Sequence, residues 1–166
     1  WDRWPRDLRD RKPEAMKEIR KALRERIHRE KFFQFLFFKQ WDALKRVCHH
    51  YGIQIIGDVP IYVAYGSADV WSNPELFKLN HQKRPAVVSG APPDTFFKTG
   101  QVWGTPVYRW EVLKETGYAW WCKRLEHNLR LHDFLRLDHF RGFVAYWEVP
   151  AGRKTSMAAQ GGSWLL

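Results

Sequence analysis

The stretch IQIIGDVPIYV, residues 53–63, decides the fold class of this chain. In its first four residues, Ile53–Ile56, three isoleucines make a short apolar, β-branched run, as expected for a strand buried on both faces. A helical pattern ends just before them at Tyr51 and Gly52, where a glycine after a helix accepts a left-handed conformation. A helix, a short connection and then a buried strand are typical of a parallel sheet, so the sequence predicts an α/β fold.

The same helix-to-strand order occurs again later in the chain. Apolar residues recur at steps of three and four over Pro13–Glu30, and a second helix is expected over about residues 31–50. Trp121, Leu125 and Leu129 lie four apart and predict a helix that leads into a strand within DFLRLDHF. A (β/α)8 barrel typically needs about 250 residues. The chain is therefore expected to be one part of such a barrel.

Residues 64–109 interrupt the α/β pattern. They are rich in Gly, Pro, Asn and Ser, have few periodic apolar positions, and are too long for an ordinary connection. We expect an irregular, loop-rich insertion that folds over the active-site face, and such insertions often carry function. The tail from Ala151 onward is also expected to be loop-like. Residues 1–166 would then form a partial catalytic barrel carrying this insertion.

Composition favours a folded, aromatic-rich protein. The chain is 45% hydrophobic and 16% aromatic, with 10 Trp. Most of these rings are explained by burial, but sugar-binding sites also stack flat indole faces on sugar rings. The net charge of +10 lies largely in early helical segments and is interpreted as a solvated helix face rather than a nucleic-acid surface. No RNP-like, zinc-finger or helix-turn-helix signature accompanies it.

The expected compartment is the cytoplasm. Cys48 and Cys122 are far apart in the sequence without a CxxC spacing, which favours free thiols, although a disulfide remains an alternative. No apolar run has membrane-spanning length, and no signal-peptide pattern is present. The chain begins at Trp1 without an initiator Met, so we expect it to be a piece of a longer protein.

The segment FLRLDHFRGF, residues 134–143, contains the first candidate catalytic residue, Asp138. It ends an apolar strand in which Arg136 and Asp138 share one face, because side chains alternate along a strand. A nearby guanidinium favours the ionised carboxylate, as a nucleophile or an electrostatic stabiliser needs. A structural ion pair would give the same pattern.

Asp58 follows the other predicted strand. If the sheet is parallel, Asp58 and Asp138 emerge on the same rim, where barrel enzymes place their active sites. The alternative is an aspartate that caps a turn.

The insertion contains a candidate sugar site in GAPPDTFFKTGQVWGTPVYRW, residues 90–110. Two prolines stiffen the chain before Asp94. Gln101 and Trp103 place a hydrogen-bonding amide beside an indole on a loop bent by glycines, which suits sugar hydroxyls and a sugar face. Trp103 could instead fill space beneath the loop.

Other polar residues carry no clear signal. Glu148, Asp69 and Asp133 have no distinctive spacing, and surface or capping roles are expected for them. The histidines lack metal-ligand spacing, so the sequence predicts no catalytic metal and no cofactor.

Several motifs together resemble a known family. IIGDVPIYVAYGSADVWSNPELF, GAPPDTFFKTGQVWGTPVYRW, LRLDHFRGF and YWEVPAG occur in the order found in the 4-α-glucanotransferases, the amylomaltases or disproportionating enzymes of the α-amylase clan. The resemblance covers nearly the whole chain. It implies a (β/α)8 barrel that transfers α-1,4-glucan segments with retention at the anomeric carbon, and partners that are maltooligosaccharides or glucans from starch or glycogen.

The resemblance also implies residue roles. Asp138 corresponds to the nucleophile that forms a β-glucosyl-enzyme intermediate, and Arg136 to the arginine that orients it and maintains its charge. His139 matches the family's Asp-His pair. The positions that hold the donor sugars are matched by Asp58, Asp94, Gln101 and Trp103.

The sequence departs from the family pattern in three ways. Gly66 replaces an acidic residue, and Thr105 replaces the usual Asn after Trp-Gly. Retaining chemistry also needs a second carboxyl about 5 to 5.5 Å from the nucleophile. The family supplies it from a Glu-Asp-Leu-Gly motif and a third acid from a His-Asp motif, and neither occurs here. We therefore expect a fragment with half of an active site; the alternatives are a non-catalytic glucan-binding module, an inactive truncated product or, less favoured, a basic nucleic-acid binder.

Overall fold

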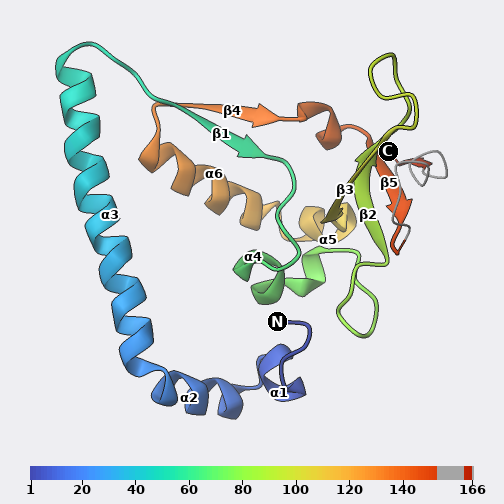
Figure 1. Cartoon of the computed structure of the whole chain (residues 1–166), viewed down its shortest axis with the longest axis horizontal. Coiled ribbons are helices and arrows are strands. Elements are labelled where there is room, and N and C mark those ends of the chain that lie inside the picture. The colour runs from blue at the N-terminus through green and yellow to red at the C-terminus, as the bar shows by residue number, and fades with distance from the viewer. Residues whose placement is uncertain (153–162, 166) are drawn as a thin grey trace. The chain divides into compact units, whose positions relative to one another are not determined.

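The computed structural model describes residues 1–152 and the backbone of 163–165, and these residues form two compact units. The first unit comprises Trp1, Arg3–Gly57 and Leu125–Arg136, and the second comprises Asp2, Asp58–Arg124 and the described residues from Leu137 onward. Helices, two paired strands and an antiparallel sheet give a mixed α/β chain (Figure 1). The described residues do not close into a barrel.

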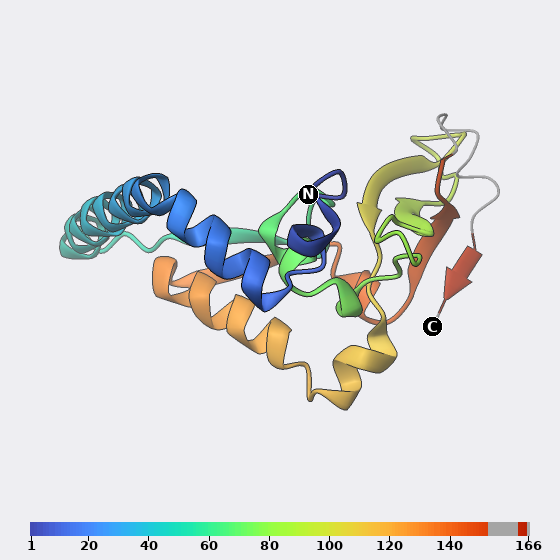
Figure 2. The same cartoon turned by 90° about the horizontal axis from the view of Figure 1, so that it is seen from below.

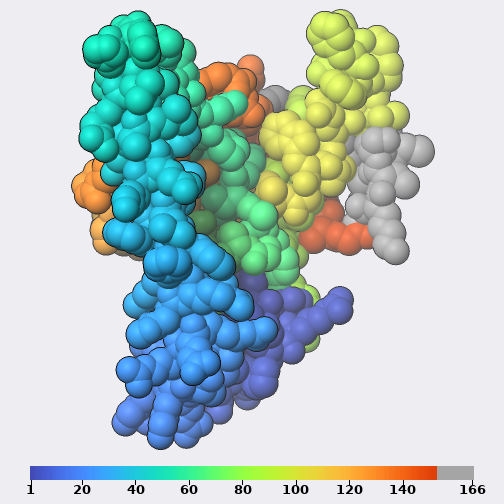
Figure 3. All heavy atoms as spheres, turned by 60° about the vertical axis from the view of Figure 1, so that its left-hand side comes forward, coloured from blue at the N-terminus to red at the C-terminus, as the bar shows by residue number. Residues whose placement is uncertain are grey.

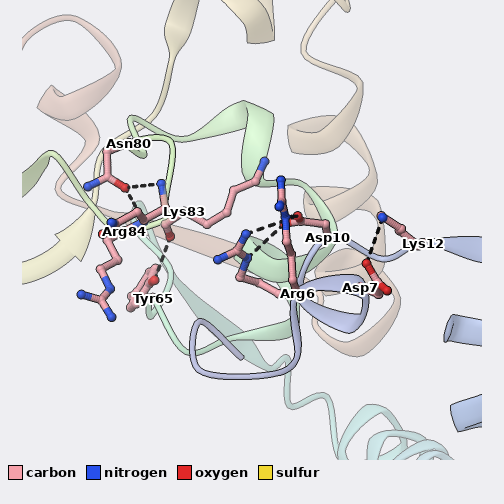
Figure 4. Close-up of polar contacts among 10 residues, drawn as sticks. Arg6, Asp7, Asp10, Lys12, Tyr65, Asn80, Lys83 and Arg84 are labelled. Carbon is pink, nitrogen blue, oxygen red and sulfur yellow. Dashed lines mark hydrogen bonds and ion pairs between the residues drawn. The ribbon is translucent and has the colours of Figure 1, made fainter.

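The first unit begins with helices α1 (Arg6–Arg9), α2 (Pro13–Ala22) and α3 (Arg24–His50). Ion pairs from Arg6 to Asp10 (3.7 Å) and from Lys12 to Asp7 (2.9 Å) surround α1 (Figure 4). Pro13 is the first residue of α2, as predicted. The predicted boundary near residue 30 is wrong, because the helices separate at Leu23, where no glycine or proline marks the break.

Helix α3 packs through one side against α6 (Ala119–Leu131). The Trp41 indole N–H donates to the Leu131 carbonyl at 2.7 Å, and the Phe38 ring lies edge-on to His127. The predicted helix stop is confirmed, since Gly52 follows α3 with a φ of +70°. Another face of α3 is open to solvent (Figure 3) and carries apolar side chains that are about half exposed: Phe33, Phe37, Leu44 and Val47.

Strand β1 runs over Ile56–Pro60, so the predicted strand Ile53–Ile56 is displaced. The backbone of Ile55 is held mainly by Asp133: its N–H donates to the Asp133 carboxylate at 2.9 Å, and its carbonyl accepts from the N–H groups of Asp133 and Phe134. Burial on both faces is also wrong, because buried Gly57 and Val59 alternate with exposed residues, and Ile56 is 69% exposed.

Strand β4 (Phe134–Asp138) forms a two-stranded sheet with β1. Figure 1 shows the two arrows running in the same direction, and each strand continues from the first unit into the second. The predicted alternation along β4 is confirmed: Leu135 and Leu137 are partly buried, whereas Arg136 and Asp138 are exposed.

The second unit contains more regular structure than the sequence predicted. Residues 64–109 include α4 (Ala68–Ser72), the 3-10 turn η1 (Pro74–Leu76) and strands β2 (Val87–Ala91) and β3 (Gln101–Pro106). Strands β2 and β3 form an antiparallel sheet with β5 (Tyr146–Pro150) and β6 (Ser163–Leu165), in the order β3-β2-β5-β6 (Figure 2). Strands β2 and β3 were missed because each is short and contains Gly or Pro.

The tail therefore departs from the predicted loop at β6, while residues 153–162 lie outside the described part of the chain. The core of the second unit gathers under this sheet and the adjoining turns. The fully buried side chains described in the second unit include Val59, Val70, Phe77, Ser89, Pro106, Val107, Tyr108, Leu113 and Val149.

Side chains fix the turn that precedes β2. The Asn80 side-chain oxygen accepts from the backbone N–H of Gln82 and of Arg84, at 2.9 and 3.0 Å. The Tyr65 hydroxyl donates to the Lys83 carbonyl at 2.8 Å (Figure 4). Lys83 can therefore keep its left-handed φ of +63°.

The predicted helix around Trp121 is confirmed as α6, and a shorter helix, α5 (Trp110–Glu115), precedes it. Gly117 and Tyr118 separate the two with φ values of +58° and +57°. Both cysteines are free thiols, as expected. Over the described residues, none of the helices is long and apolar enough to cross a membrane.

Candidate active site

A pocket of about 450 Å³ lies within the second unit. Three chain segments build it: the end of β1 with the residues that follow, the middle of β3, and the end of β4. Three of the sequence-predicted site residues, Trp103, Asp138 and His139, meet here. The complete lining is Pro60, Ile61, Tyr62, Trp103, Thr105, Asp138 and His139.

Asp138 is the last residue of β4, and its side chain is exposed at the pocket. The chain then bends at His139, which has a left-handed φ of +50° and precedes the 3-10 turn η2 (Phe140–Phe143). Gly142 lets two side chains pack closely against this bend, because a Cβ there would lie 2.5 Å from Ile61 Cδ1 and 3.1 Å from His139 Cδ2. The bend thus brings a carboxylate and an imidazole, adjacent in sequence, to one pocket.

The His139 imidazole is in an environment that disfavours its charged form. Partial burial lowers its pKa most, the Asp138 carboxylate opposes this by raising it, and the Arg141 guanidinium lowers it further. The net direction is downward from the ordinary value of 6.5. At neutral pH the side chain is therefore a neutral hydrogen-bonding group rather than a second positive charge beside Asp138.

The indole of Trp103 is held on two sides. Its N–H donates to the Gln101 side-chain oxygen at 3.1 Å, and the His139 ring lies edge-on to it with centroids 4.9 Å apart. Trp103 remains 37% exposed. The amide-beside-indole prediction is therefore realised as a direct bond that orients the ring, although Gln101 itself does not line the pocket.

The wall formed by Pro60 and Ile61 is fixed by residues that the sequence did not single out. The fully buried Tyr108 hydroxyl donates to the Ile61 carbonyl at 2.7 Å, and Arg124 donates to the Pro60 carbonyl at 2.8 Å. The Arg124 guanidinium also lies over the Trp121 ring, 5.0 Å from its centroid. Tyr108 lies within the motif of residues 90–110, but neither that motif nor the density of aromatic residues specifies these partners.

Tyr62 is a further lining residue that the sequence did not identify. It is 7% exposed, and its hydroxyl is buried without a hydrogen-bond partner among the described residues. Burial chiefly raises its pKa, with smaller effects in the same direction from Tyr146 and Glu148. The hydroxyl therefore stays protonated. Its position within GDVPIYV, just after Asp58, was the available signal.

The remaining predicted site residues lie outside the pocket lining. Asp94 accepts from the backbone N–H groups of Phe96 and Phe97, at 2.8 and 2.6 Å, and so caps its own loop. Asp58 is exposed in β1. Arg136 is exposed on the same face of β4 as Asp138, as the alternation predicted.

Other acids have structural partners. Glu148 pairs with Lys78 at 2.8 Å in the second unit. In the first unit, Asp133 contacts Lys45 and His49. Among the seven lining residues, Asp138 is the one carboxylate. Residues 1–152 and 163–165 contain no group of three or more His, Cys, Asp or Glu side chains placed to hold a metal ion.

Comparison with known proteins defines the class. Residues 1–164 match the model of glycoside hydrolase family 77, described as 4-alpha-glucanotransferase. The chain belongs to this family, as the motif resemblance predicted.

Individual relatives agree with this assignment. The chain is 52% identical over 165 residues to the 4-alpha-glucanotransferase of Aquifex aeolicus and 50% identical to that of Thermus thermophilus, covering 99% of this chain and 33% and 32% of those proteins. It is similar in structure to the amylomaltase of Streptococcus agalactiae solved in complex with acarbose, with a TM-score of 0.92, 42% identity, and coverage of 99% and 33% of the two chains. The chain thus spans about a third of the length of the relatives it matches.

Proposed function

We propose that this chain carries the nucleophile-bearing part of a retaining 4-α-glucanotransferase. The observation that supports this most directly is the pocket in which Asp138, the one lining carboxylate, adjoins the indole of Trp103 and the imidazole of His139. Membership of the 4-alpha-glucanotransferase family supplies the reaction class.

Asp138 would act as the nucleophile. Its carboxylate oxygen attacks the anomeric carbon of a maltodextrin unit while the α-1,4 bond breaks, and a general acid protonates the departing 4-oxygen. In the second step an acceptor 4-hydroxyl, deprotonated by the same group, attacks that carbon and releases Asp138. Arg136, on the same face of β4, would orient the carboxylate.

The general acid must be a second carboxyl close to Asp138. No other lining residue of this pocket has one. We propose that it belongs to polypeptide corresponding to the two-thirds of the relatives that this chain does not span. In that complete enzyme β1 and β4 would be two strands of a (β/α)8 barrel, with residues 64–109 as an insertion over its active-site face.

The donor sugars would be held by the aromatic and polar residues of the insertion. Trp103, oriented by Gln101, offers an indole for stacking on a glucose ring. Asp94 and Asp58 would hydrogen-bond sugar hydroxyls, and His139, neutral at pH 7, would do so beside the nucleophile. The S. agalactiae amylomaltase was solved with acarbose; the substrates proposed here are maltooligosaccharides and glucans from starch or glycogen.

Substitution of the nucleophile in the complete enzyme tests the proposal. Asp138→Asn should remove almost all transfer of glucose units between maltotriose molecules while largely preserving maltodextrin affinity, because the amide keeps the shape of the carboxylate but cannot attack carbon. Asp42→Asn, an exposed change in α3, is the matched control and should leave turnover unchanged. Near wild-type turnover in Asp138→Asn would refute the assignment.

The second candidate is a glucan-binding module without catalysis, favoured by the single carboxylate of the pocket. Titration of the 166-residue chain with maltoheptaose, followed by Trp fluorescence, tests binding, while maltotriose transfer by the same chain tests catalysis. Saturable binding without transfer would support the module. Binding to nucleic acid, the third possibility, predicts an affinity that falls steeply with salt.

A cytoplasmic location is also part of the proposal. Relatives from Solanum tuberosum and Arabidopsis thaliana are named chloroplastic or amyloplastic, which makes a plastid the alternative. Cell fractionation with an antibody against this chain distinguishes the two compartments.

A further inference from the structure

The edge strand β3 bulges where it contributes to the pocket. Val88 of β2 pairs with Pro106 of β3, and Gly90 of β2 pairs with Val102. A single residue of β2, Ser89, therefore lies opposite three residues of β3. These three are Trp103, Gly104 and Thr105.

Gly104 permits this bulge through its conformation. Its φ is +78°, and a Cβ at this position would have no neighbour within 4 Å, so the backbone angle rather than lack of space requires glycine. Bulges occur preferentially at sheet edges and beside active sites, where they redirect side chains. Here the residues on both sides of Gly104 line the pocket.

A hydroxyl pair closes the bulge. The Ser89 Oγ and Thr105 Oγ1 atoms lie 2.5 Å apart, within hydrogen-bond distance, and Ser89 is fully buried. Breaking this hydrogen bond would cost free energy, because a buried hydroxyl without a partner also lacks the hydrogen bonds that it would make to water. Thr105 is also stiff at χ1 because it is β-branched. The hydroxyl of Ser89, which lies outside the pocket lining, therefore fixes the position of Thr105 in the pocket wall.

We infer that Ser89 is a positioning residue for the pocket. Through Thr105 it closes the bulge, and so it holds Trp103 and the Thr105 side chain where they contact a glucose unit of an α-1,4-glucan. The inference rests on the proposed function, since it assumes that the pocket binds sugar. Ser89 itself does not line the pocket and touches no substrate.

The first test measures positioning without a ligand. In the 166-residue chain, Ser89→Ala should increase amide hydrogen exchange at Gly104 and Thr105 by about three- to ten-fold, the equivalent of one net hydrogen bond. Exchange in α3 should not change. Thr105→Ser retains the hydroxyl and should exchange as slowly as the wild type, whereas Thr105→Val keeps the shape, loses the hydroxyl and should exchange like Ser89→Ala.

The second test measures sugar handling in the complete enzyme. Ser89→Ala should raise KM for maltotriose about three- to ten-fold, because Trp103 and Thr105 would be held less firmly. It should change kcat little, because Asp138 belongs to β4 and not to β3. The double variant Ser89→Ala with Thr105→Val should lose no more than either single variant, since both remove the same bond.

Unchanged exchange at Gly104 and Thr105 in a folded Ser89→Ala variant would overturn the inference, as would additive losses in the double variant. A variant that lowers kcat and leaves KM unchanged would also overturn it. If Ser89→Ala speeds exchange at the bulge but the complete wild-type enzyme binds no maltodextrin, the proposed function would be contradicted. The role of Ser89 in positioning the bulge would then still hold.

Discussion

Gly90 is the position at which a single methyl group should disturb the pocket most severely. It lies in β2, a central strand, with Val102 of β3 on one side and Trp147 of β5 on the other. A Cβ at Gly90 would overlap the backbone carbonyl oxygen of Gln101 and would also touch Val149 Cγ2 at 3.4 Å. Its φ lies outside the left-handed region, so alanine would be prevented by lack of space rather than by backbone conformation.

The cost of Gly90→Ala follows from which atoms can move. The Cβ to Gln101 oxygen separation would be well below 3.0 Å, which real Cβ atoms essentially never show, and a backbone oxygen cannot rotate away. Overpacking of this kind costs about 1–3 kcal/mol. Separation of β3 from β2 would weaken ladder hydrogen bonds worth about 1 kcal/mol each. The lower chain entropy of unfolded alanine returns less than about 1 kcal/mol. We therefore expect a net loss of about 3 kcal/mol.

Thermal and urea unfolding of the 166-residue chain, followed by circular dichroism, would measure this loss. For a chain of this size about 3 kcal/mol corresponds to a fall of roughly 10 °C in Tm. Gly66→Ala is the matched control, since a Cβ there has no neighbour within 4 Å and no left-handed φ is required, and its stability should stay within about 0.5 kcal/mol of the wild type. If the two variants were equally stable, the close approach of β2 and β3 would be refuted.

Two further perturbations test other parts of the structure. Tyr108→Phe removes the hydroxyl that donates to the Ile61 carbonyl and should cost about 1–3 kcal/mol in urea unfolding, because that carbonyl loses its 2.7 Å partner; a loss below about 0.5 kcal/mol would contradict this. The pKa of Asp133 is held well below its ordinary value of 3.8, first by the Ile55 N–H and then by His49. A depressed carboxyl pKa contributes stability that is present above about pH 4 and is lost as pH falls further. Asp133→Asn should therefore lose less stability than the wild type between pH 5 and about pH 3, and an equal loss in both proteins would rule out this role.

The sequence predicted the elements whose signals are local. The stop at Gly52 and the end of β4 at Asp138 were predicted correctly, because a glycine C-terminal to a helix and side-chain alternation act over a few residues. The start of β1 was misplaced, since the backbone of Ile55 is bound by Asp133, which lies far away in the sequence. No window around Ile55 contains that information.

The sequence indicated which residues of the candidate site could react with or bind a ligand, but not which residues hold them in place. Asp138 and Trp103 were candidates from their residue type and local pattern, His139 was added by the family resemblance, and all three line one pocket. Ser89 and Tyr108 act through contacts across 16 and 47 residues of sequence, respectively. A serine in a short strand and one tyrosine among many aromatic residues have no spacing that indicates such partners.

In the proposed site, chemistry and sugar binding would be carried by separate elements, because the lining residues belong to different sheets. The carboxylate of Asp138 comes from β4, which pairs with β1, whereas Trp103 and Thr105 come from β3 of the antiparallel sheet. A change confined to the β2–β3 contact, such as Ser89→Ala, should alter how the proposed site holds a sugar without removing Asp138, the proposed nucleophile. A change at Asp138 should remove turnover while largely preserving sugar affinity. Sugar affinity and turnover should therefore respond independently to substitutions in the two sheets, which a site built on one strand would not allow.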